Sequence, residues 1–134
     1  MAKPRAIKLQ RDIDDLLAGR KPLAVAGKRS RAVSAFYYIR PLEENGAEPL
    51  LFLFHAAKRG IPNSHDRNKQ KRRMRQAVSD LAVFEAVASK LRASSRQALV
   101  LLRTVREPSA QASWEIILAD LEVIGKKLEE VIGA

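Results

Sequence analysis

The densest positive charge in the chain lies within residues 65–78, HDRNKQKRRMRQAV, where six Lys or Arg side chains occur in a stretch with helical character. Five donor-bearing side chains share one face of such a helix, at 100° per residue: Arg67, Asn68, Lys71, Arg72 and Arg75. Guanidinium forks and an amide at one-turn intervals match phosphate and ribose oxygens. Because Asp66 is the only acid in the segment, pairs within the helix cannot balance its charge. We therefore expect a partner outside the chain to supply the negative charge.

A second candidate surface is the aromatic segment 32–41, AVSAFYYIRP, whose β-branched and aromatic residues favour a strand. Strand alternation divides it into two faces, one with Val33, Ala35, Tyr37 and Ile39 and the other with Ser34, Phe36, Tyr38 and Arg40. Two aromatic rings between Ser and Arg form a plausible platform for the unstacked bases of a single strand. The alternative, a second packed face beneath a helix, stays open.

Residues for catalysis or metal binding are sparse. The only histidines, His55 and His65, have no ligand spacing, and we interpret them as a partly buried strand residue and a helix-start residue. Asp12, Asp14 and Asp15 are typical of acids near the start of a surface helix, with a metal site as the less favoured alternative. Neither a GxGxxG nor a P-loop pattern occurs. We expect no catalytic residue and no metal site in the protein itself.

Composition limits the class of protein. The 134 residues, 46% of them hydrophobic, fit a single domain over residues 1–134. A net charge of +10 indicates a polyanionic partner, either nucleic acid or an anionic membrane. The longest apolar run, PLLFLF, is too short to span a bilayer, the N-terminal segment lacks the apolar core of a signal peptide, and the absence of cysteine agrees with a reducing compartment. We therefore expect a cytoplasmic protein.

Periodicity predicts the element order α-β-β-α-α-β-α after a flexible basic arm at residues 1–8. The expected elements are a helix near 9–18 ended by Gly19, a loop over 20–31, strands at 32–41 and 49–57, a basic helix capped by Ser64 or Asp66 and running to about Val78, a helix at 80–93, a buried strand at 97–104, and a final helix opened by Pro108 and Ser109.

Two of these expectations are specific enough to check residue by residue. Asn45-Gly46 lies between the first two strands and predicts that they pair as an antiparallel hairpin. The final helix carries an apolar stripe at three- and four-residue steps, which predicts a core-facing helix: Trp114, Ile117, Leu121, Ile124, Leu128 and Val131.

The segment RNKQKRRMRQA at 67–77 resembles the signature of the bacterial ribonuclease P protein component. In that signature, Arg-Asn-Arg is followed by an apolar residue, by Lys-Arg and then by an Arg-Glu pair. The positions that coincide are Arg67, Asn68, Lys71, Arg72 and Arg75. Three positions depart from the pattern: Lys69 replaces the second Arg, Gln70 stands where an aliphatic residue is usual, and Gln76 replaces the Glu. The order and size of the surrounding elements also resemble the family.

The resemblance implies a fold of the α+β class, a single-domain α/β sandwich similar to domain 2 of ribosomal protein S5, with a left-handed crossover that carries the basic helix. It implies that the chain is the accessory protein subunit of an endoribonuclease, in which the RNA subunit, with Mg²⁺, hydrolyses the phosphodiester at the 5′ end of mature tRNA. The protein would bind that RNA and receive the 5′ leader of precursor tRNA in a cleft beside the sheet.

The resemblance also implies the binding residues. Those expected to bind the RNA subunit are Arg67, Asn68, Lys69, Lys71, Arg72 and Arg75, with the preceding basic pair Lys58 and Arg59. Those expected to bind the leader are Phe36, Tyr38 and Arg40 on the strand, with Ile13 and Leu17 in the first helix, where family members often carry Phe. No membrane partner and no obligate protein partner are expected.

Two other functions stay open from the sequence. One is a ribosomal or other structural RNA-binding protein that has no catalytic complex. The other is a protein that binds acidic membranes through its basic helix, although that helix lacks the bulky apolar face that such binding requires.

Overall fold

The structure is a computed structural model that describes residues 5–23, 33–43, 47–56, 61, 63–104 and 114–133. These residues form a five-stranded mixed sheet and four helices, which confirms the predicted α+β class. The helices are α1 (Gln10–Gly19), α2 (Ser64–Asp80), α3 (Ala82–Ala93) and α4 (Trp114–Gly133). The strands are β1 (Arg5–Ala6), β2 (Lys21–Pro22), β3 (Val33–Pro41), β4 (Leu50–His55) and β5 (Arg96–Thr104).

The strand order is β1-β4-β5-β3-β2, so the predicted hairpin between the first two long strands is wrong. β5 lies between β3 and β4, antiparallel to β3 and parallel to β4. Residues 97–102 of β5 are buried, as a central strand covered on both faces requires. Asn45 and Gly46, on which the hairpin prediction depended, lie outside the described residues.

Two short strands extend the sheet at its edges. Arg5–Ala6 pairs parallel with β4, and the Ile7 N–H donates to the Phe52 carbonyl over 2.9 Å. The predicted flexible arm at 1–8 is therefore wrong for its described second half, because pairing and burial of Ile7 hold it on the sheet. At the opposite edge, β2 (Lys21–Pro22) pairs antiparallel with β3. β2 lies within residues 20–31, for which the sequence predicts a loop.

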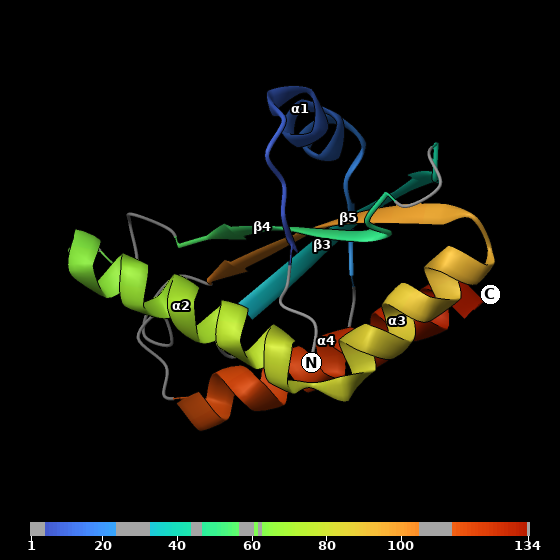
Figure 1. Cartoon of the computed structure of the whole chain (residues 1–134). Coiled ribbons are helices and arrows are strands. Elements are labelled where there is room, and N and C mark those ends of the chain that lie inside the picture. The colour runs from blue at the N-terminus through green and yellow to red at the C-terminus, as the bar shows by residue number, and fades with distance from the viewer. Residues whose placement is uncertain are drawn as a thin grey trace.

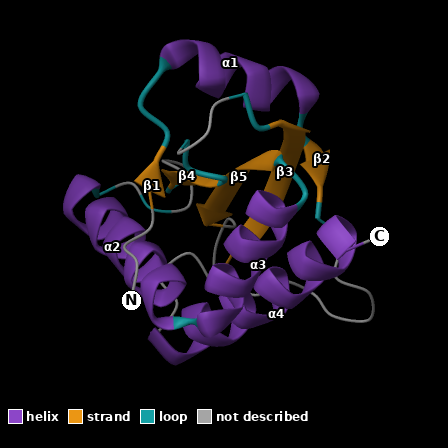
Figure 2. Cartoon of the chain, turned by 45° about the vertical axis from the view of Figure 1, so that its right-hand side comes forward, coloured by secondary structure: helices purple, strands orange, loops and turns teal. Residues whose placement is uncertain are grey.

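Helices cover the two faces of the sheet unequally (Figures 1 and 2). α2, α3 and α4 lie on one face over the larger apolar cluster, to which β3 contributes Val33, Ala35, Tyr37 and Ile39. α1 alone lies on the other face, over a smaller cluster that includes Leu16, Leu99 and Leu101. The strand alternation expected for residues 33–40 is thus confirmed.

The ends of α2 differ slightly from the prediction. Neither Ser64 nor Asp66 caps the helix, because the Asn63 side chain accepts a hydrogen bond from the His65 N–H over 2.8 Å. At the other end α2 continues to Asp80, and the Leu81 N–H donates to the Ala77 carbonyl. α3 begins immediately afterwards.

The apolar stripe predicted for the last helix is confirmed in α4. Its buried residues include Ile117, Leu121, Ile124 and Leu128, while Trp114 and Val131 are half-buried at the margins of the core. The expected start at Pro108 and Ser109 falls on residues that the structure does not describe. Ile132, which the predicted stripe omitted, is buried as well.

The close approach of α3 and α4 yields a prediction about Gly125. A Cβ atom at this buried position would clash with Val83 Cγ1 and meet Phe84 Cζ at 3.3 Å, so Gly125→Ala must displace α3 or α4. Overpacking of this kind should lower the free energy of unfolding by about 1–3 kcal/mol, measured by urea denaturation. Gly133→Ala is the control, since its Cβ meets nothing within 4 Å. Equal stability of the two variants would contradict this packing.

Candidate nucleic-acid interface

The basic helix α2 is fixed to the rest of the protein along one face. That face contacts β4 and α4, and its buried residues are Gln70, Met74, Ala77 and Val78. Gln70 occupies the position where the family pattern has an aliphatic residue, and within the described residues its Oε1 atom has no hydrogen-bond partner. A helix anchored in this way fixes the backbone positions from which its remaining side chains project.

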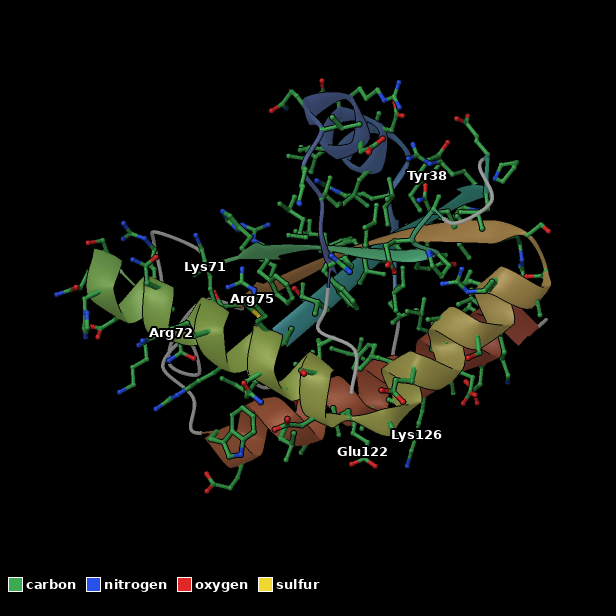
Figure 3. All side chains as sticks on the ribbon, viewed as in Figure 1. Tyr38, Lys71, Arg72, Arg75, Glu122 and Lys126 are labelled. Atoms are coloured by element: carbon green, nitrogen blue, oxygen red, sulfur yellow. The ribbon has the colours of Figure 1, made fainter. Side chains whose placement is uncertain are left out.

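The predicted donors extend around the helix from the edge of this buried face, near Arg67, to its far side, at Arg72. Arg67 and Lys71 are half-buried, and Asn68, Arg72 and Arg75 are exposed. Lys71 and Arg75 project from α2 toward the sheet, whereas Arg72 projects from the other side of the helix (Figure 3). Lys69 is also exposed, but at 100° per residue it lies about 200° around the helix from Arg67. Lys58 and Arg59 fall in a part of the chain that the structure leaves undescribed.

Four of the six cations of α2 have no carboxylate partner among the residues that the structure describes. Among the described residues, Lys69, Lys71, Arg72 and Arg75 form no ion pair with a carboxylate. The Arg75 guanidinium instead lies 5.2 Å from the centroid of the Phe54 ring, which limits its motion without neutralising it. By contrast, cations of α4 are paired, as in Lys126 with Glu122 at 3.6 Å.

Arg67 has a structural contact in addition to its place in the donor array. Its Nη1 atom donates to the Ile61 carbonyl over 2.9 Å, and Ile61 is fully buried. This bond holds the chain just before α2 against the helix. A variant at Arg67 would therefore disturb local structure, and Arg72 is the better position for a binding test.

On the other side of the sheet, α1 covers the predicted aromatic platform. Phe36 and Tyr38 lie on this face as expected, and both are half-buried in the smaller apolar cluster. The Tyr38 ring lies so close to Gly19 that a Cβ atom there would approach it to 2.8 Å. The Arg20 guanidinium lies 5.3 Å from the centroid of the Phe36 ring, a contact that strand alternation alone could not reveal. The rings of Phe36 and Tyr38 thus pack beneath α1 and are also partly accessible to solvent.

Arg40 joins α1 to the sheet. Its Nη2 donates to Asp12 Oδ1 over 2.8 Å, its Nη1 to Asp15 Oδ2 over 3.1 Å, and its Nε to Gln97 Oε1 over 2.8 Å. Asp12 is buried, so its interpretation as a surface acid is wrong. Arg40 supplies the counter-charge that offsets the desolvation of this carboxylate. A phosphate group that bound Arg40 would have to compete with these carboxylates.

The two helix positions expected to bind the leader differ in exposure. Ile13 is half-buried against the smaller apolar cluster, whereas Leu17 is 44% exposed. Leu17 is therefore available for contact with a ligand on the surface of α1. Ile13 mainly contributes to the packing of α1 on the sheet.

The described residues contain no group of three or more His, Cys, Asp or Glu side chains placed to hold a metal ion. None of the described helices has the length and apolar character needed to cross a membrane.

No protein-family model, curated protein or solved structure matches the chain.

The exposure of Arg72 yields a prediction about RNA binding. Arg72→Ala should weaken the binding of a bacterial ribonuclease P RNA about tenfold, because one charge-assisted phosphate contact is lost. The slope of log affinity against log salt concentration should fall by about one unit. Filter binding over a series of salt concentrations measures both quantities.

Lys126→Ala provides the matched control, since it removes the same charge from an exposed position on α4, far from the donors of α2 (Figure 3). It should leave the affinity and the salt slope nearly unchanged. If both variants lose affinity equally, the RNA responds to net charge and not to the α2 face.

Proposed function

We propose that this protein is the protein subunit of a bacterial ribonuclease P, which binds the catalytic RNA subunit and the 5′ leader of precursor tRNA and assists endonucleolytic removal of the leader. One observation carries the proposal. The signature positions Arg67, Asn68, Lys71, Arg72 and Arg75 lie on a helix that is anchored along its buried face, and Lys71, Arg72 and Arg75 form no ion pair with a carboxylate among the described residues. RNA phosphates supply the counter-charge that such an array requires.

In this proposal the RNA subunit, with Mg²⁺, provides the hydrolytic chemistry. The described protein residues offer no set of carboxylates or imidazoles suited to hold the metal, so no step is assigned to a metal on the protein. The α2 donors neutralise phosphates of the RNA subunit and fix its position. The sheet face beside α1 binds the single-stranded leader through Phe36, Tyr38 and Leu17, which in turn positions the cleavage site.

The finer features of the fold belong to the same proposal. Adjacent parallel strands β4 and β5 are joined by the segment that carries α2 and α3, which supports the expected crossover bearing the basic helix. We propose that this crossover is left-handed, as the family resemblance implies. We also propose that the domain resembles domain 2 of ribosomal protein S5, which the same resemblance implies. We also assign the protein to the cytoplasm, where precursor tRNA is processed in bacteria.

A structural RNA-binding protein without a catalytic complex is the second candidate. The same unpaired charge on α2 favours it, because phosphate contacts alone carry no information about the identity of an RNA. The two candidates differ in what the bound RNA does, so a cleavage assay separates them.

The cleavage assay uses a bacterial ribonuclease P RNA at a Mg²⁺ concentration too low for the RNA to act efficiently alone. Adding the protein should increase the rate of precursor-tRNA cleavage at least about tenfold, since the α2 cations replace part of the screening that Mg²⁺ supplies. The product should carry the mature 5′ end, and RNA-free protein should cleave nothing. RNA binding without any stimulation would favour the structural RNA-binding protein instead.

Tyr38 provides a prediction about the leader. Tyr38→Leu keeps an apolar side chain against α1 but removes the aromatic ring, whose stacking on a base is worth about 1–3 kcal/mol. The holoenzyme should bind precursor tRNA about tenfold more weakly. Binding of mature tRNA, which has no leader, should be unchanged. Equal weakening of both substrates, with an unaltered circular-dichroism spectrum, would show that Tyr38 is only a packing residue.

A further inference from the structure

Two residues that have no assigned role so far, His55 and Arg103, lie where β4 and β5 end. His55 of β4 is the register partner of Arg103 of β5, and Arg103 is the partner of Ser34 of β3. Their chain neighbours Phe54 and Leu102 are buried in the larger cluster, so alternation directs His55 and Arg103 to the face that α1 covers. Both side chains are exposed there.

A second cation, Lys71, reaches this place from α2. Partial burial first, and then the positive charges of Arg103 and Lys71, lower the pKa of His55 below its ordinary value of 6.5. Lys71 projects from α2 toward the sheet (Figure 3). The two charged groups that act on His55 are thus both cations, and they come from different elements.

Within the described part of the chain, the other elements packed against β4 place no counter-charge at this end. From β1, Arg5 is paired with Glu48 near the start of β4, at 3.5 Å. From α2, Arg75 lies over Phe54 on the opposite face of the strand. α3 contacts that same opposite face through Phe84, whose ring meets Phe52 edge to face. The cations therefore repel one another unless an anion binds between them.

A neighbouring residue of β3, Phe36, indicates which kind of anion could bind between the cations. Phe36 lies two residues along β3 from Ser34, about 7 Å away, with the Arg20 guanidinium over its ring. An aromatic ring beside a cationic cluster suits a nucleotide, whose base stacks while its phosphate is bound by the cations. A small inorganic anion would bind the cations but could not stack on the aromatic ring.

We propose that His55, Arg103 and Lys71 form a phosphate-binding site for a single RNA strand, next to a base-stacking surface made by Phe36 and Arg20. The proposal rests on the RNA-binding part of the proposed function and adds His55 and Arg103 to the signature residue Lys71. His55 donates to the phosphate when its imidazole is protonated, so binding of RNA is coupled to uptake of a proton.

The sign of this coupling follows from the charges. In the free protein partial burial and then the cationic neighbours lower the pKa of His55, whereas a bound phosphate raises it. The complex therefore holds more protons than the free protein between the two pKa values. RNA affinity must rise as the pH falls, and a difference of about one pKa unit gives about a tenfold change.

The test measures binding of a fluorescent octauridylate at pH 5.5, 6.0, 6.5 and 7.0 and constant ionic strength. The probe carries no terminal phosphate, because such a group itself titrates near pH 6. The native chain should gain about fivefold to tenfold in affinity between pH 7.0 and 5.5. His55→Ala should bind with an affinity that hardly changes over this range. Arg103→Gln should weaken binding at every pH.

His65→Ala is the matched control, since His65 is the only other histidine and lies exposed in the first turn of α2. It should retain the pH dependence of the native chain. A second measurement follows the His55 ring protons by NMR, and octauridylate should shift their titration to higher pH. Equal pH dependence in the native chain and His55→Ala, or an unshifted His55 titration at saturating RNA, would overturn the site.

Holoenzyme measurements distinguish the possible sources of the strand. If His55→Ala weakens binding of precursor tRNA but not of mature tRNA, the phosphate belongs to the leader. If it weakens assembly with the RNA subunit, the phosphate belongs to that RNA, and either result supports the site. Failure of the protein to stimulate cleavage, with the octauridylate results as expected, would reject only the proposed function. Stimulated cleavage without any effect of His55→Ala on octauridylate would reject only the site.

Discussion

β5 is hydrogen-bonded along both of its edges, to β3 and to β4, and its residues 97–102 are buried between the two layers of helices. Its parallel pairing with β4 requires the intervening chain to cross one face of the sheet, and this places α2 and α3 there. The same position sets Arg103 beside His55. The charged surfaces on both sides of the protein therefore depend on where this one strand is inserted.

The helical face of α2 could be predicted from the sequence because it depends on local geometry. One hundred degrees per residue brings Arg67, Lys71 and Arg75 together in any straight helix, and the apolar residues 74, 77 and 78 mark the buried side. Alternation likewise separated Phe36 and Tyr38 from Tyr37. The apolar stripe of α4 could be predicted from helical periodicity for the same reason.

Pairing between distant segments could not be predicted in this way. The turn signal at 45–46 favoured a local hairpin, but β5 forms more extensive pairing with both strands than a two-stranded ribbon offers. The ion pairs of Arg40 with Asp12 and Asp15 join residues more than 20 positions apart. Strand alternation, which is a local pattern, therefore could not predict that α1 packs over this face of the sheet. The cluster at His55 was missed for the same reason, because its three members come from β4, β5 and α2.

The central claim is that the fixed cations of α2 bind one particular RNA, and competition binding tests it most directly. Labelled bacterial ribonuclease P RNA is bound to the protein at physiological salt and displaced by unlabelled ribonuclease P RNA or by a ribosomal RNA fragment of equal length. The account predicts that the ribonuclease P RNA competes at least about 100-fold better, since specific sites exceed general phosphate binding by such factors or more. Equal competition by the two RNAs would contradict it.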